Sequence, residues 1–107
     1  MPRFIPPELL EARLADFVVL DVRKTPARSA SGKTIAGSLF RIALDAEEWQ
    51  SEFEGRRVVV FCVHGHEVSQ GACRVLTDNG IDAFVLDGGF SAWEAASYPV
   101  QPIGDER

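Results

Sequence analysis

The sequence predicts an α/β sandwich, with helices on both faces of a mostly parallel β-sheet. Three runs of strand length, "FVVLD" at 17–21, "VVVFC" at 58–62 and "AFVLD" at 83–87, are rich in β-branched or aromatic residues. The first two lack polar alternation, which is typical of strands buried on both faces in a parallel sheet. Stretches with helical spacing separate the runs, and this alternation favours parallel strand-helix units.

The first predicted helix covers about 7–15 and follows a short apolar start at Phe4-Ile5. In "PPELLEARLAD" prolines stand where a helix begins, a glutamate follows early, and Leu9, Leu10 and Leu14 have helical spacing. This helix precedes the first buried strand.

The next two segments are a predicted loop and a predicted short helix. Residues 23–37 are polar and rich in small residues, which indicates a long surface loop with a short strand at Thr34-Ile35. Loops of this length often carry function. The stretch 44–53, "LDAEEWQSEF", favours a short helix with Trp49 and Phe53 one turn apart.

The second half of the chain contains two further helices and a tail. A helix beginning near Val68 is predicted to end at "DNG", residues 78–80, which is a helix-stop signal. "GGFSAWEAA" at 88–96 indicates a glycine turn followed by a short helix, and 98–107 is expected to be a terminal tail.

Length and composition favour one globular domain spanning residues 1–107, with 46% apolar and 25% charged residues. The net charge of −5 argues against a nucleic-acid partner. No stretch approaches the ~20 apolar residues of a membrane span, and the start lacks the layout of a secretory signal. We therefore expect a cytoplasmic protein without a membrane partner.

The two cysteines, Cys62 and Cys73, are too few for a disulfide framework and lack metal-site spacing, which favours a reducing compartment. Cys62 ends a predicted strand, and the turn after it leads into a helix whose first N–H groups lack helical partners. Such a loop forms an anion-binding nest that stabilises a thiolate, and Gly65 allows it to turn through positive φ. The alternative is a buried core cysteine.

Four motifs resemble a known family. They are "LDVR" at 20–23, "TIAGS" at 34–38, "CVHGHEVS" at 62–69 and "LDGGFSAW" at 86–93. In this order they resemble a rhodanese domain of the single-domain sulfurtransferase type. The resemblance implies a three-layer α/β/α sandwich with a central sheet of about five strands. The loop also resembles rhodanese-like modules found in or beside chromate-resistance proteins.

The resemblance implies a persulfide relay. Cys62 takes a sulfur atom from a small donor, thiosulfate or a persulfide, and passes it to cyanide or a thiol, with a protein acceptor as a further option. Backbone N–H groups of the loop would stabilise the persulfide anion. No metal or organic cofactor is implied. Besides Cys62, the expected site comprises Val63, His64, Gly65, His66, Glu67 and Val68.

Charged groups near this loop carry two interpretations each. Glu67 stands where many family members have arginine, and at the pocket rim it would repel thiosulfate by about 1 kcal/mol at 4 Å in water; alternatively it turns outward. Arg28 and Arg41 are candidates for the missing positive charge, or are solvated surface arginines. His64 and His66 could donate to an anion or titrate near neutrality.

Three further residues are interpreted structurally. Asp21 and Arg23 are expected to tie the loop after their strand. Cys73 is expected off the main apolar face of its helix and about 9 Å or more along the helix from the loop, so no resolving role is expected for it.

Two other functions compete with sulfur transfer. Rhodanese-like phosphatases and arsenate reductases carry arginine at the sixth position after the cysteine, where this chain has Val68. A domain with a silent loop that serves as a binding or regulatory module is the third hypothesis.

Overall fold

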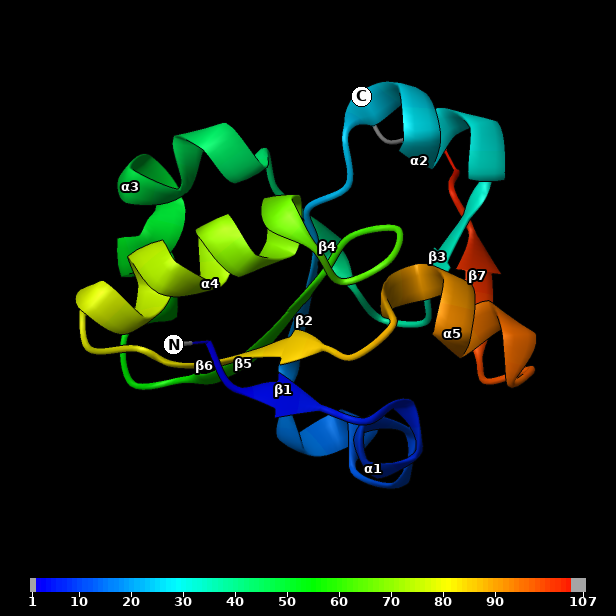
Figure 1. Ribbon diagram of the computed structural model, residues 1–107, viewed down its shortest axis with the longest axis horizontal. Coiled ribbons are helices and arrows are strands. Elements are labelled where there is room, and N and C mark those ends of the chain that lie inside the picture. The colour runs from blue at the N-terminus through cyan, green and yellow to red at the C-terminus, as the bar shows by residue number, and fades with distance from the viewer. Residues whose placement is uncertain (1, 105–107) are drawn as a thin grey trace.

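The central feature of the fold is a five-stranded sheet between two layers of helices (Figure 1). The computed structural model describes residues 2–104. The strand order is β1-β6-β5-β2-β4, and all four neighbouring pairs are parallel. The strands are β1 Phe4–Ile5, β2 Val18–Asp21, β4 Leu39–Phe40, β5 Arg57–Phe61 and β6 Asp82–Leu86. The predicted three-layer sandwich is confirmed.

Five α-helices within the described residues complete the layers. They are α1 Pro7–Ala12, α2 Thr25–Ser31, α3 Ala46–Trp49, α4 Glu67–Asp78 and α5 Gly89–Ala95. Helices α3 and α4 cover one face of the sheet, and α1 and α5 cover the other. Among the described helices, none is long and apolar enough to cross a membrane.

Strand β5 shows why the predicted runs lack polar alternation. Val58 and Val60 enter the core under α3 and α4, whereas Val59 and Phe61 enter the core under α1 and α5. All four side chains are fully buried. A strand packed on both faces has no place for a solvated side chain, which is the situation expected in a parallel sheet.

The predicted helices at 7–15 and 44–53 are interrupted. Helix α1 ends at Ala12, and a 3₁₀ turn follows over Leu14–Asp16. The second stretch consists of three short pieces, the 3₁₀ turn Ala43–Asp45, helix α3 and the 3₁₀ turn Gln50–Phe53. The rings of Trp49 and Phe53 still pack edge to face, with centroids 6.0 Å apart.

The prediction of a loop over 23–37 is wrong for its first half, which forms α2. This helix has Pro26 in its first turn and ends at Gly32 in the left-handed conformation, with φ 70°. Its side chains are mostly Ala and Ser, so no large apolar residues mark a helical period. The predicted strand at Thr34-Ile35 is present as β3, Lys33–Ile35.

The prediction of a tail over 98–107 is wrong where the chain forms β7, Val100–Pro102. This strand pairs antiparallel with β3 in a separate two-stranded sheet. Gln101 also accepts a hydrogen bond from the backbone N–H of Gly37, at 3.0 Å. Part of the predicted tail, residues 105–107, lies outside the described residues.

Candidate active site

Cys62 lies at the carboxyl end of β5, in the middle of the sheet. Only 6% of the residue is exposed. The neighbouring strand runs alongside it, since the N–H of Val22 donates to the carbonyl of Phe61 at 3.0 Å. The thiol is therefore at the carboxyl ends of the strands, where the ligand crevices of parallel sheets occur.

The loop after Cys62 turns at Gly65, whose φ is 78°. A Cβ at this position would lie 2.8 Å from the carbonyl oxygen of Leu86, so both the backbone angle and the close approach require glycine. The side-chain amide of Gln70 donates to the carbonyl of Gly65 at 3.0 Å. The loop thus lies closely against the end of β6 and is hydrogen-bonded to α4.

The start of α5, where Gly88 and Gly89 stand, supports the loop from behind. The N–H groups of Phe90 and Ser91 donate to the carbonyls of Cys62 and Val63 at 2.8 and 2.9 Å. A Cβ on Gly89 would lie 2.6 Å from both of these carbonyl oxygens. With the two carbonyls held by α5, N–H groups farther along the loop are directed toward the sulfur. Sequence reasoning assigned the glycines only to a turn and missed this contact.

Hydrogen bonding determines the electrostatics of Cys62. Burial of the thiol raises its pKa, but the Ser69 hydroxyl and the backbone N–H groups of Ser69, His66 and Gly65 together outweigh that effect and lower the pKa below the ordinary value. The Ser69 oxygen is 3.0 Å from the sulfur. Ser69 was not among the predicted site residues, although its place in the first turn of the helix after Cys62 could have indicated it.

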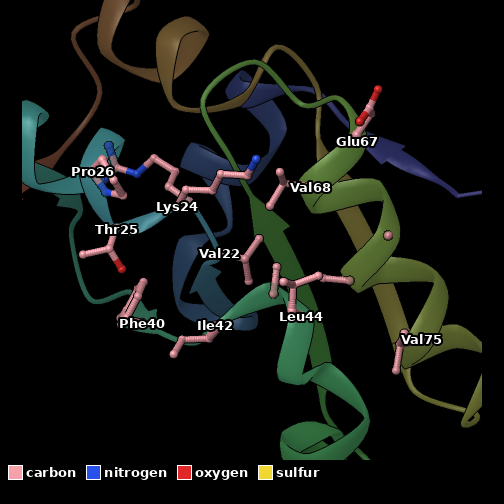
Figure 2. A pocket seen from close by; sticks show the side chains of 14 residues that line it. Val22, Lys24, Thr25, Pro26, Phe40, Ile42, Leu44, Glu67, Val68 and Val75 are labelled. Atoms are coloured by element: carbon pink, nitrogen blue, oxygen red, sulfur yellow. The ribbon is translucent and has the colours of Figure 1, made fainter.

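The other predicted loop residues lie on the outside of the turn or at its rim. His64 and His66 are exposed and their ring centroids are 6.2 Å apart. Val63 and Val68 are half-buried. Glu67 is exposed, and its carboxylate points away from the groove below it (Figure 2). The described residues include no group of three or more His, Cys, Asp or Glu placed to hold a metal ion.

Both arginines predicted as pocket charges bind other residues of the chain. Arg28 is buried, and its Nε donates to Asp21 at 2.9 Å, so it is not a solvated surface arginine. Arg41 donates to the carbonyl of Phe40 at 2.8 Å and to Glu52 at 2.7 Å. Asp21 also accepts bonds from the side chain of Arg23, and this pair ties the end of β2 as expected.

A groove of about 650 Å³ lies next to the loop, between the end of β2, the segment after β4, and α4 (Figure 2). Glu67 and Val68 contribute to its lining. So does Lys24, whose amino group points toward Val68 (Figure 2). Lys24 was not predicted as a site residue. Residues 23–37 were interpreted as a surface loop, and no contact was assigned to Lys24.

Cys73 differs from the expectation that it lies off the apolar face of α4. It is fully buried in the core under α3 and α4. Burial raises the pKa of this thiol. Only Cys62 therefore combines a depressed pKa with a position at the end of the sheet.

Fold and loop together define a domain that holds a buried thiol of lowered pKa among hydrogen-bond donors at the carboxyl ends of a parallel sheet. The family model described as a rhodanese-like domain matches residues 6–96. The chain belongs to the rhodanese-like domain family.

Individual relatives agree with this membership. The thiosulfate sulfurtransferase GlpE of Pseudoalteromonas translucida is 33% identical over 90 residues, which cover 83% of this chain and 82% of that protein. GlpE of Vibrio cholerae is 42% identical over 53 residues, about half of each chain (49% and 48%). These similarities support a sulfurtransferase-like enzyme.

Among solved structures, a rhodanese-related protein from Thermoplasma volcanium superimposes with a TM-score of 0.82. It is 27% identical, and the match covers 92% of this chain and 97% of that one. The described fold therefore extends over nearly the whole of that relative.

Proposed function

We propose that the protein carries sulfane sulfur on Cys62. The Cys62 thiolate attacks the outer sulfur of thiosulfate or a persulfide; the bond between outer and inner sulfur breaks, and sulfite or a thiolate leaves with the electron pair. Cyanide or a thiol then attacks the outer sulfur of the Cys62 persulfide, and the thiolate is regenerated. The two half-reactions balance without a cofactor.

The observation that carries the proposal is the ring of donors around the sulfur. The Ser69 hydroxyl and three backbone N–H groups lower the pKa of Cys62, so they favour an anion at this point. The outer sulfur of a persulfide is also anionic and would lie at the mouth of the same ring. Donors held rigidly before the charge arrives need no reorganisation during the reaction.

A mass measurement tests the relay. Wild type, Cys62→Ala and Cys73→Ser are incubated in turn with thiosulfate, mercaptopyruvate and glutathione persulfide, and their intact masses are recorded. We expect wild type and Cys73→Ser to gain one sulfur atom that cyanide removes, and Cys62→Ala to gain none. No cyanide-labile sulfur from any donor would contradict the relay and would favour a binding module.

The proposal includes the compartment and the partners. A thiol of lowered pKa and a second free cysteine, Cys73, persist in the reduced state in a compartment such as the cytoplasm. The partners are a small sulfur donor and a thiol or cyanide acceptor, with a protein thiol as a further acceptor.

A further inference from the structure

The groove beside the Cys62 loop is larger and more apolar than thiosulfate or cyanide requires. Its volume of about 650 Å³ is in the range of pockets that bind small organic molecules. Ile42 and Leu44 line it while remaining 52% and 96% exposed, and a bound apolar group would shield them from water. Its apolar side chains include Val22, Phe40, Ile42, Leu44, Val68 and Val75.

The groove begins at the end of the Cys62 loop, where Glu67 and Val68 line it. Val22, which lines it, follows β2 and donates its N–H to the residue before Cys62. Val68, on the opposite wall, precedes Ser69, whose hydroxyl is 3.0 Å from the sulfur. A molecule that presents a sulfur atom to Cys62 therefore has an apolar surface beside it for the rest of its structure.

Lys24 brings a positive charge to this end of the groove. The amino group of Lys24 points toward Val68, whereas the carboxylate of Glu67 points away from the groove (Figure 2). A carboxylate close to the transferred sulfur would meet Lys24. An apolar substituent attached to the same carbon would extend toward Ile42 and Leu44.

We propose, building on the sulfur-transfer function above, that the donor is a small organic persulfide with an apolar side group and a carboxylate next to its sulfur. The Cys62 thiolate attacks the terminal sulfur of this R–S–SH. The new sulfur-sulfur bond forms on Cys62 as the old one breaks, and the R–S⁻ thiolate leaves into the groove with the electron pair. The proton remains on the transferred sulfur, so no oxidant or reductant is needed.

Two donors that differ by one phenyl group test the proposal. They are the persulfides of 2-mercaptopropionate and of 2-mercapto-3-phenylpropionate, with sulfur transfer to cyanide as the readout. We expect kcat/KM for the phenyl donor to be about tenfold higher or more, because burial of a ring is rewarded only where an apolar groove receives it.

Substitution of Gly71 fills the groove. A Cβ on Gly71 meets no atom within 4 Å, and Gly71 lines the groove, so the side chain of Gly71→Leu projects into open space. We expect this variant to lose about tenfold in kcat/KM for the phenyl donor and to abolish the preference. Thr77→Leu, at an exposed position of α4 outside the groove, is the matched control and retains the preference.

The possible results separate this inference from the proposed function. Equal kcat/KM for the two donors in wild type, or a faster reaction with a persulfide on a protein cysteine, would overturn the inference and leave sulfur transfer intact. Absence of any persulfide on Cys62 would overturn both. If Gly71→Leu does not fold, Leu44→Asp, at an almost fully exposed position, makes the same test.

Discussion

The sulfur of Cys62 is subject to two opposing effects. Removal from water disfavours the thiolate, whereas the Ser69 hydroxyl and three backbone N–H groups favour it, and the second effect is larger. A hydrogen bond to a charged group contributes about 1.5–3 kcal/mol, so a few such bonds offset substantial desolvation. At the residue scale, therefore, the reactive state depends on the number of donors around the sulfur.

Replacement of Ser69 by Ala removes the one side-chain donor. We expect the pKa of Cys62 to rise, because a hydrogen bond that favours the thiolate over the thiol is lost. The rate of iodoacetamide alkylation, followed by mass spectrometry at Cys62 from pH 5 to 10, should show its midpoint at higher pH. At pH 7 the variant should react several-fold more slowly than wild type.

Ser91→Ala is the control for this measurement. Ser91 is exposed and contributes its backbone N–H to the loop, and its side chain is not among the groups that shift the pKa of Cys62. Its alkylation profile should match wild type. An unchanged midpoint in Ser69→Ala would mean that the backbone donors alone hold the thiolate.

At the scale of elements, the start of α5, with Gly88 and Gly89, holds the Cys62 loop in shape. The first N–H groups of α5 bind carbonyls of Cys62 and Val63 instead of water. This arrangement brings two backbones into contact, which only a residue without a Cβ permits at Gly89. The family motif "LDGGFSAW" therefore belongs to the site as well as to the core.

Gly89→Ala should disrupt the loop. The added Cβ would lie 2.6 Å from two loop carbonyls, and φ is 62°, so we expect at least a tenfold loss of sulfur transfer together with lower stability. Gly37→Ala is the matched control, since Gly37 has φ 79° but open space around its Cβ position. It should cost about 1 kcal/mol in thermal or urea unfolding and leave transfer intact. Equal behaviour of the two variants would show that the close approach is unimportant.

Helix α2 shows where pattern reasoning is limited. Its residues carry no apolar stripe, so local periodicity offers no signal for a helix. The contacts of α2 with other elements include the bond from Arg28 to Asp21 on β2, and the left-handed Gly32 caps its end. Buried strands such as β5 were predictable because their apolar composition follows directly from burial on both faces.

At the scale of the whole molecule, Asp21 joins three elements beneath the site. Its fully buried carboxylate accepts bonds from Arg23, from Arg28 on α2 and from the hydroxyl of Thr34 on β3. Through β3 and its partner β7, the network also includes the C-terminal part of the chain. One carboxylate thus holds α2 and β3 against the end of β2.

Asp21→Asn should be strongly destabilising. The charge of Asp21 pairs with the buried Arg23 and Arg28, and breaking a buried ion pair costs about 3–5 kcal/mol. Asp82→Asn is the comparison, because Asp82 pairs with Arg3 and Arg57 but its side chain is 44% exposed; exposed pairs contribute at most about 1 kcal/mol. Urea unfolding of both variants measures the difference, and similar losses would contradict a structural role for the network.

The sequence by itself determined the α/β class, the buried parallel strands and the position of Cys62 at a strand end before a helix. These features depend on composition and short-range spacing, which local sequence contains. Tertiary structure decided that Arg28 donates a hydrogen bond to Asp21, that residues 100–102 form a strand, and that Lys24 lines a groove beside the loop. Each of these depends on a partner from another element, and no local pattern specifies which distant residue that partner is.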